Sequence, residues 1–134
     1  MKKLSSLLVF LVTILFSVQA QNYIGFSKNE IISEITTEGI KYIDEKNKYG
    51  IPYLLIANKA EKVLRVYYFD SKNTCVKYVV FFEDGNYITL LNTLNKNYKR
   101  FGDKWYDLNT EIELKYDAEM KGYLMEFNIY DTNN

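Results

Sequence analysis

Few residue types in this chain could carry out chemistry, because it contains no histidine and a single cysteine among 134 residues. Without histidine, Ser–His–Asp catalysis, Cys–His catalysis and the usual histidine-based zinc and iron sites are excluded. One cysteine cannot form a CxxC redox or thiolate–metal site. The sequence also contains neither of the glycine-rich loops, GxGxxG and GxxxxGK[ST], that bind nucleotide phosphates. We therefore expect no catalytic residue, no metal site and no cofactor.

Paired carboxylates are the remaining option for catalysis. Glu111 and Glu113 alternate along one predicted strand, which places them on one face about 7 Å apart, a distance compatible with glycoside hydrolysis. A small hydrolase that uses carboxylates alone is thus an alternative function, although Glu–Glu–Lys alternation is also the usual pattern of a solvated strand face. The acids at 83–84 and at Asp103 and Asp107 could bind calcium, but they lack EF-hand spacing and also suit turns.

Cys75 begins an apolar segment and has two interpretations. It could be a reactive thiol or form an intermolecular disulfide, with Lys77 as the nearest cation. Alternatively, it packs as a small buried hydrophobic residue, as unpaired cysteines usually do.

Aromatic residues provide the strongest indication of a binding surface, because the chain contains 13 tyrosines and many of them fall on predicted strands. Tyr68, Tyr78 and Tyr130 are out of phase with the neighbours assigned to the core, and Trp105 lies at a strand entrance. We predict that these four residues form an exposed platform that recognises a protein or a glycan. The alternative is that the tyrosines pack at the core rim with their hydroxyl groups in water.

The N-terminus predicts export. Lys2 and Lys3 precede an apolar run from Leu4 to Val18, and small residues at the −3 and −1 positions predict cleavage after Ala20. No cysteine follows the run, so a lipid anchor is not expected, and an uncleaved N-terminal anchor is the alternative. We expect residues 1–20 to be a signal peptide and the protein to be periplasmic or secreted, with no membrane span in its mature form.

The rest of the chain, residues 21–134, is expected to form one domain. Its 114 residues are enough for a hydrophobic core. The leader holds two of the 17 basic residues and none of the 17 acidic ones, so the remainder has a net charge of −2. Nucleic acid is therefore not an expected partner. The lone cysteine leaves the domain without an internal disulfide, so its core alone must stabilise it.

Two amphipathic helices are expected. The first begins with a capping box, Ser27 and Glu30, and ends near Gly39. The second covers residues 87–100, with Lys99 and Arg100 in its last turn, and residue 102 is a glycine that would end it. The charged segment 40–52 between the first helix and the sheet is expected to be a mobile connection, with a possible short edge strand at Ile40–Ile43.

Short apolar or alternating segments predict strands at Tyr53–Ala57, Val63–Phe69, Cys75–Phe82, Thr110–Tyr116 and Tyr123–Tyr130. Polar turns separate them at 58–61, 70–73 and 117–122, which favours antiparallel meanders. The predicted fold class is α+β: one antiparallel sheet of five to seven strands with two amphipathic helices on one face, in the order helix–meander–helix–meander.

The segment Tyr23–Ile31 resembles the G-x-[ST]-x-x-E-[IV] helix entrance of the beta-lactamase-inhibitor-like and outer-membrane-assembly small lipoprotein families. The resemblance implies a helix–sheet domain, and the chain lacks the lipid-acceptor cysteine of the assembly lipoproteins. With the strand that holds Cys75 and Tyr78, and with the segments at 94–98 and 102–105, the pattern resembles small exported proteins of unknown function from Bacteroidota-type bacteria. That resemblance brings no functional residues.

Together these features predict an exported, non-catalytic binding or envelope-associated module. Its contact surface is expected on the exposed sheet face and the 40–52 segment. A dimer that buries a sheet face or edge in a structural role is a further alternative.

Overall fold

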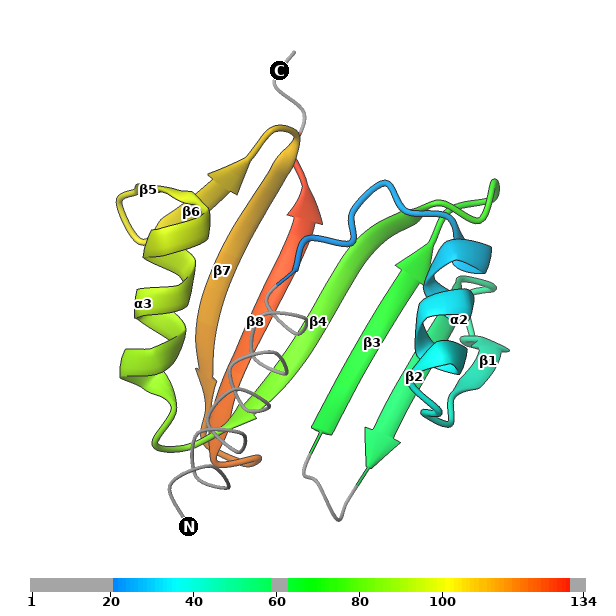
Figure 1. Ribbon diagram of the computed structural model, residues 1–134, viewed down its shortest axis with the longest axis horizontal. Coiled ribbons are helices and arrows are strands. Elements are labelled where there is room, and N and C mark those ends of the chain that lie inside the picture. The colour runs from blue at the N-terminus through cyan, green and yellow to red at the C-terminus, as the bar shows by residue number, and fades with distance from the viewer. Residues whose placement is uncertain (1–20, 59–62, 131–134) are drawn as a thin grey trace, which may run out of the picture.

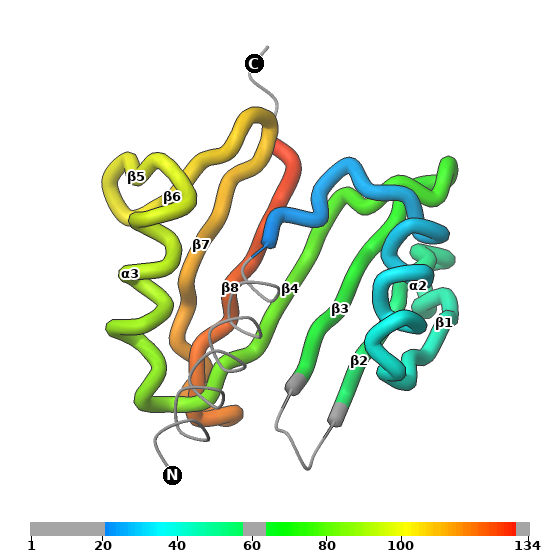
Figure 2. The backbone as a smooth tube through the Cα atoms, viewed as in Figure 1, coloured from blue at the N-terminus to red at the C-terminus, as the bar shows by residue number. Residues whose placement is uncertain are grey.

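The computed structural model describes residues 21–58 and 63–130, which form one eight-stranded antiparallel sheet and two α-helices (Figure 1, Figure 2). The helices are α2 (Lys28–Thr37) and α3 (Tyr87–Asn97). The strands are β1 (Ile43–Lys46), β2 (Pro52–Asn58), β3 (Val63–Phe69), β4 (Cys75–Glu83), β5 (Lys99–Phe101), β6 (Lys104–Asp107), β7 (Thr110–Asp117) and β8 (Gly122–Ile129). The predicted leader, most of the turn at 58–61 and the polar tail lie outside the described residues.

The sheet is open, with strand order β1-β2-β3-β4-β8-β7-β6-β5. Two four-stranded meanders meet where β4 pairs with β8, and a helix precedes each meander along the chain. The α+β class, the two helices and the antiparallel sheet are confirmed. The predicted count of five to seven strands is wrong, because the sheet has eight: β1, β5 and β6 join the five strands assigned from the sequence.

Helix α2 begins as its sequence predicts. The Glu30 N–H donates to Ser27 Oγ at 3.1 Å, and the Ser27 N–H donates to the Glu30 carboxylate at 3.2 Å, which completes the capping box. Ile31 and Ile35 are buried against the sheet. Beyond the helix, Gly39 adopts a left-handed conformation (φ +73°) and its N–H donates to a helix carbonyl, so the predicted glycine stop is also confirmed.

Part of the segment expected to be a loop is a strand. β1 pairs with the start of β2, and the Asn47 side chain accepts the N–H groups of Tyr49 and Ile51 in the turn between them. The short edge strand predicted at Ile40–Ile43 begins at Ile43 instead. All four β1 side chains are exposed, so the sequence has no burial periodicity that could have revealed the strand.

The end of α3 also differs from the prediction. The helix ends at Asn97, so Lys99 and Arg100 belong to β5 and not to the last helical turn. Arg100 lies over the Trp105 ring at 5.0 Å and donates from Nε to the Gly102 carbonyl, which stabilises the β5–β6 hairpin. Gly102 (φ +67°) forms the turn of this hairpin and does not end the helix.

Both helices cover one face of the sheet, α2 near the β1 end and α3 near the β5 end (Figure 1). Cross-strand register places Tyr67, Tyr78 and Phe127 in one row on this face. The Tyr67 and Tyr78 rings stack at 4.6 Å between centroids, and Tyr23 packs edge-on against both, at 5.3 and 5.0 Å. This aromatic row is the centre of the core because it lies where the two meanders meet.

Gly122 in β8 lies so close to β4 that a substitution there tests how tightly the two strands are packed. A Cβ atom at this position would lie 2.3 Å from the Phe82 carbonyl oxygen and 2.5 Å from the Phe81 ring. We predict that Gly122→Ala lowers the free energy of unfolding by about 3 kcal/mol, because backbone must move to admit the methyl group. Urea unfolding measures the change. Gly102→Ala, which meets no atom within 4 Å, should cost only about 1 kcal/mol for its left-handed backbone; equal losses would contradict the packing argument.

Candidate functional site on the helix-free face of the sheet

The structure separates the four residues predicted to form an exposed platform. Tyr78 and Trp105 are buried, with exposed fractions of 0% and 2%, so their predicted exposure is wrong. Tyr78 lies in a strand that is apolar on both faces, which gives the sequence no phase from which to assign it. Trp105 is covered by α3, and its indole N–H donates to the Asn95 side chain at 2.8 Å.

Tyr68 and Tyr130 both lie toward the face without helices but do not form one site. Tyr68 is half-buried in β3, where its ring lies 6.4 Å from that of Tyr53. Tyr130 follows β8 and is 42% exposed, and its ring contacts Tyr106 of β6 at 5.4 Å. The two tyrosines are therefore at opposite sides of the sheet centre, so the predicted platform does not exist as one surface.

Cross-strand register divides the helix-free face into two chemically different halves. Over β2, β3 and β4, with one position of β8, the side chains on this face are apolar or aromatic except for Lys77 of β4 at the border. We call this set the apolar half; its members, all partly exposed, are Tyr53, Leu55, Leu64, Val66, Tyr68, Val79, Phe81 and Leu124. The remaining strands, β6, β7 and most of β8, carry charged side chains on the same face.

The second half is a continuous ladder of ion pairs, which we call the charged half. Lys104 Nζ lies 2.9 Å from Glu111 and 3.2 Å from Glu113, and Lys115 Nζ lies 3.2 Å from Glu113 and 3.1 Å from Glu126. Each lysine thus bridges two carboxylates. The hydrogen bond that Lys104 donates lowers the pKa of Glu113, and the hydrogen bonds that Lys104 donates to Glu111 and Glu113 raise its own pKa.

These ion pairs bear on the carboxylate-hydrolase alternative. Glycoside hydrolysis needs one carboxylic acid that stays protonated near neutral pH, which requires a raised pKa. Glu111 and Glu113 share the ammonium of Lys104, and the pKa of Glu113 is lowered and not raised. The geometry therefore disfavours this pair as a general acid and its partner.

A shallow hollow of about 300 Å³ lies within the apolar half, lined by Asn47, Tyr53, Leu55, Val66 and Tyr68. The Tyr53 hydroxyl at its rim donates to Glu45 at 3.3 Å. Its volume is at the lower limit of small-molecule pockets. With few polar groups in its lining, the hollow suits an apolar side chain of a protein partner better than a sugar ring.

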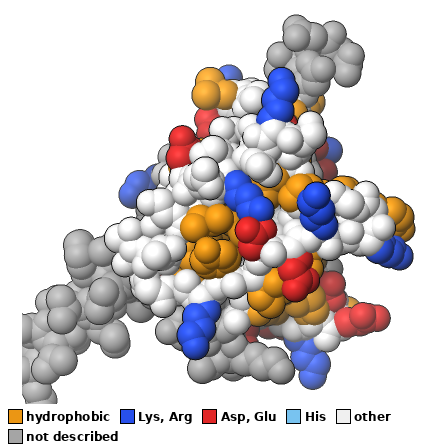
Figure 3. Space-filling model, turned by 90° about the vertical axis from the view of Figure 1, so that its right-hand side faces the viewer, with side chains coloured by type: hydrophobic (Ala, Val, Ile, Leu, Met, Phe, Trp, Pro, Cys, Tyr) orange, Lys and Arg blue, Asp and Glu red, His pale blue; other side chains and the backbone are white. Residues whose placement is uncertain are grey.

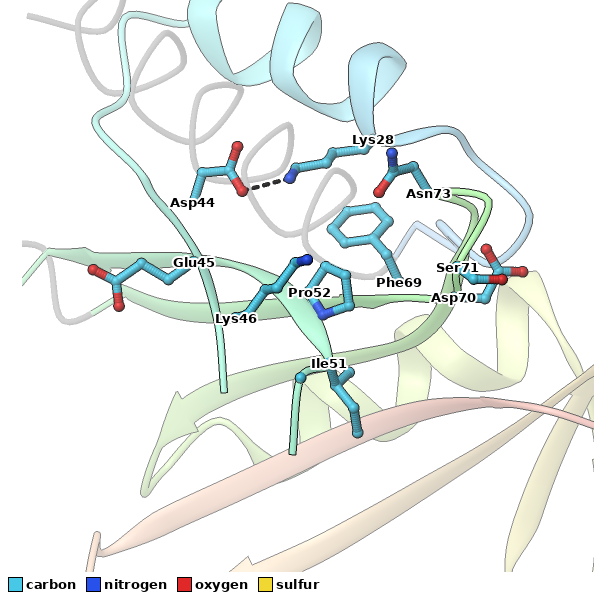
Figure 4. A pocket seen from close by; sticks show the side chains of 11 residues that line it. Lys28, Asp44, Glu45, Lys46, Ile51, Pro52, Phe69, Asp70, Ser71 and Asn73 are labelled. Carbon is cyan, nitrogen blue, oxygen red and sulfur yellow. Dashed lines mark ion pairs between the residues drawn. The ribbon is translucent and has the colours of Figure 1, made fainter. Parts of the chain in front are cut away.

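A larger groove of about 770 Å³ lies at the β1 edge, on the helix side of the sheet (Figure 4). Lys28 at the start of α2 pairs with Asp44 of β1 at 2.5 Å and lies over the Phe69 ring at 6.0 Å. Asp70 accepts two backbone N–H groups of its own turn. Positive and negative side chains lie beside small hydrophobic patches on this side of the molecule (Figure 3). The groove includes part of the predicted 40–52 surface, and two of its charged side chains, Lys28 and Asp44, are paired with each other.

Sequence reasoning missed a buried arginine. Arg65 in β3 is 4% exposed; its guanidinium donates to the Tyr67 hydroxyl at 3.4 Å, and its Nε has no hydrogen-bond partner among the described residues. Tyr23 donates to Glu34 of α2 at 3.0 Å, and these side chains surround a space too small for water. The sequence does contain a signal for its burial: Arg65 is two residues from Tyr67 on an apolar strand, so both side chains lie on the same face.

Cys75 is buried and unpaired, which favours the packing interpretation. The backbone of Gly25 and Phe26 crosses over it with two hydrogen bonds, and its thiol donates to the Lys77 carbonyl at 3.5 Å. Burial raises the pKa of the thiol to about 12. A thiol in this state is not nucleophilic near neutral pH.

Within residues 21–58 and 63–130, no three His, Cys, Asp or Glu side chains lie close enough to hold a metal ion. Two of the acids considered for calcium have other partners, because Asp84 accepts from Tyr116 and Asp107 accepts from Asn22. No helix among the described residues is sufficiently long and apolar to cross a membrane.

No family model, curated protein or solved structure matches the chain. The resemblance of its helix entrance to other exported proteins therefore stays a prediction, and the candidate site rests on the geometry of this chain alone.

The burial of Cys75 predicts low reactivity in the folded protein. At about pH 8, iodoacetamide should label the native protein about a thousandfold more slowly than the protein in concentrated guanidinium chloride, because the raised pKa leaves few thiolates. Mass spectrometry of the labelled fraction over time measures both rates. Fast labelling of the native protein would instead support the reactive-thiol interpretation.

The buried tyrosines predict alkaline unfolding. Burial raises the pKa of Tyr67 to about 12 and also raises those of Tyr23 and Tyr78. Below a pH of about 10, both the folded and the unfolded chain keep these protons, so stability is unaffected. Above that pH the unfolded chain loses protons that the folded chain retains, so the free energy of unfolding should fall as pH rises toward 12.

Urea titrations at several alkaline pH values measure this fall. Tyr67→Phe should make it shallower, whatever its effect on stability at neutral pH. Tyr49→Phe, at a position that is 76% exposed, is the matched control and should leave the slope unchanged. If the two variants had the same slope, buried phenols would not be its cause.

Proposed function

We propose that the protein is an exported, non-catalytic interaction module whose contact surface is the apolar half of the helix-free face. The proposal of export rests on the basic and apolar leader at residues 1–20. The proposal of a contact surface rests on one observation: eight partly exposed apolar and aromatic residues lie together on three neighbouring strands and β8, and neither of the two described helices covers them.

The contrast between the two halves of the face supports this proposal. A sheet covered by helices on one side usually presents alternating polar residues on the other. The charged half follows that rule, with Lys104 and Lys115 each joined to two carboxylates. The apolar half departs from it, and grouped exposed apolar residues commonly mark interaction sites.

The chemistry of the apolar half favours a protein over a glycan as the partner. Sugars need several hydrogen-bonding groups beside an aromatic ring, whereas the hollow between β2 and β3 is lined mainly by Leu55, Val66, Tyr53 and Tyr68. Protein interfaces have this composition, with tyrosines around a central apolar pocket. Nucleic acid is disfavoured by the net charge of −2 after the leader.

Site-specific photo-crosslinking in the producing cells tests the contact surface. A benzophenone amino acid in place of Val66, at the centre of the apolar half, should give discrete cross-linked products because a partner covers it. The same residue in place of Tyr106, on the same face in the charged half, is the matched control and should give at least about tenfold less product. Absence of discrete products at position 66, or equal products at both positions, would contradict the proposal.

A further inference from the structure

We infer that the partner of the apolar half is a second copy of this chain, packed face to face around a two-fold axis that runs along the strands between β2 and β3. This inference rests on the proposed contact surface and specifies its occupant. It follows from the positions of two charged residues at the border of the apolar half, together with the order of the apolar residues between them.

One row of the helix-free face shows the pattern. Register places Glu45, Tyr53, Tyr68 and Lys77 directly opposite one another on β1, β2, β3 and β4. The row thus has an acid at one end, a base at the other and two tyrosines between them. With strands about 4.8 Å apart, the two charged positions are separated by about 14 Å.

The proposed axis matches each of these residues to a complementary one. Rotation about a line between β2 and β3 places β1 opposite β4 of the second copy, and β2 opposite β3. Glu45 then faces Lys77 of the second copy, and Lys77 faces the second copy's Glu45, which gives two equivalent ion pairs. Tyr53 faces Tyr68 in the same way.

The neighbouring row is apolar and pairs equally well. Register aligns Ile43, Leu55, Val66 and Val79 across the same four strands. The rotation places Leu55 opposite Val66 and Ile43 opposite Val79, so no charge is buried at the centre. Ile43 is 47% exposed in the single chain, and this contact would cover it.

The two border charges are available for such pairs. Lys77 has no ion pair among the described residues, whereas Lys104 and Lys115 on the same face have two each. Glu45 is exposed, and its carboxylate accepts a hydrogen bond from the Tyr53 hydroxyl at 3.3 Å. Packed sheets lie about 10 Å apart, a gap that a lysine and a glutamate reaching toward each other can close.

A two-fold axis elsewhere on the face would not place complementary residues of the two copies opposite each other. Rotation about a line between β4 and β8, the centre of the sheet, would place the apolar half on the charged half of the other copy. Lys104, Lys115 and their carboxylates would then be desolvated against apolar side chains, which is costly. The charged half therefore restricts the second copy to strands β1 to β4.

The size of the surface sets the expected strength of the dimer. Four strands at 4.8 Å and about seven residues at 3.4 Å give a flat footprint of about 450 Å². Because side chains make the surface uneven, the solvent-accessible area that each copy would bury is larger than this flat footprint. It approaches the lower end of the range for specific interfaces. We therefore expect a reversible dimer whose dissociation constant is in the micromolar range and not an obligate one.

Sedimentation velocity of the purified protein over a hundredfold range of concentration tests the inference. The wild type should shift from monomer to dimer. Val66→Lys should be monomeric throughout, because it places a charge at the centre of the contact. Circular dichroism should show that this surface variant remains folded.

A charge exchange tests the axis itself. Glu45→Lys and Lys77→Glu should each weaken the dimer about tenfold, because each replaces two attractions with two repulsions. The double variant Glu45→Lys/Lys77→Glu restores both pairs and should return to within about twofold of the wild type. Lys99→Glu, in the same row but on β5, is the matched control and should have no effect.

The outcomes separate this inference from the proposed function. A wild type that remains monomeric at every concentration overturns the second copy as occupant, and a dimer that the double variant does not restore overturns the axis. In either case, cross-linked products of another mass at position 66 would still uphold the contact surface. Monomeric protein with no cross-linked product at position 66 would overturn both.

Discussion

Strand β4 is the element on which the rest of the structure depends, because it joins the two meanders and is apolar on both faces. Tyr78, Val80 and Phe82 point toward the helices and are buried. Val79 and Phe81 point the other way and are only partly covered. A strand that needs cover on both sides receives helices on one side alone, so its second face remains available for contact. The fold and the candidate surface thus have the same origin.

The helix side shows how that burial is organised. The stack of Tyr67 and Tyr78, with Tyr23 against both rings, holds the segment before α2 on the centre of the sheet. Arg65 extends this arrangement to the end of the helix, where Tyr23 and Glu34 lie nearby. A buried guanidinium among phenol hydroxyls is costly without hydrogen bonds. Its presence makes the position of α2 on the sheet specific, since a shifted helix would leave more of these groups unsatisfied.

Local signals made much of the fold predictable from sequence. The capping box at Ser27 and Glu30, the glycine stop and the alternating strands β7 and β8 were each confirmed, because those patterns depend on residues close in the chain. Of the two edge strands, β1 was expected only as a possible short strand at Ile40–Ile43 and β5 was missed, because an edge strand with every side chain exposed has no burial pattern. In the structure each is identified by pairing with its hairpin partner, β1 with β2 and β5 with β6.

The candidate site was harder to predict than the fold for a related reason. Tyr68 was placed correctly on the helix-free side, but Tyr78 was not, since a strand with two apolar faces gives no phase. The apolar half consists mostly of Leu, Val and Phe, which sequence reasoning assigns to a core. Their grouping depends on the register of four strands, and so does the separation of Glu45 from Lys77.

The charged half gives the helix-free face its specificity. An apolar sheet face alone would attract partners in many positions and registers, and exposed sheets are prone to such association. The ladder from Glu111 to Glu126 is satisfied within the chain, so a partner that covered it would lose solvation and gain no new pair. A contact is therefore favourable only over β1 to β4. The ion pairs that argue against catalysis thus also determine where on the sheet a partner can bind.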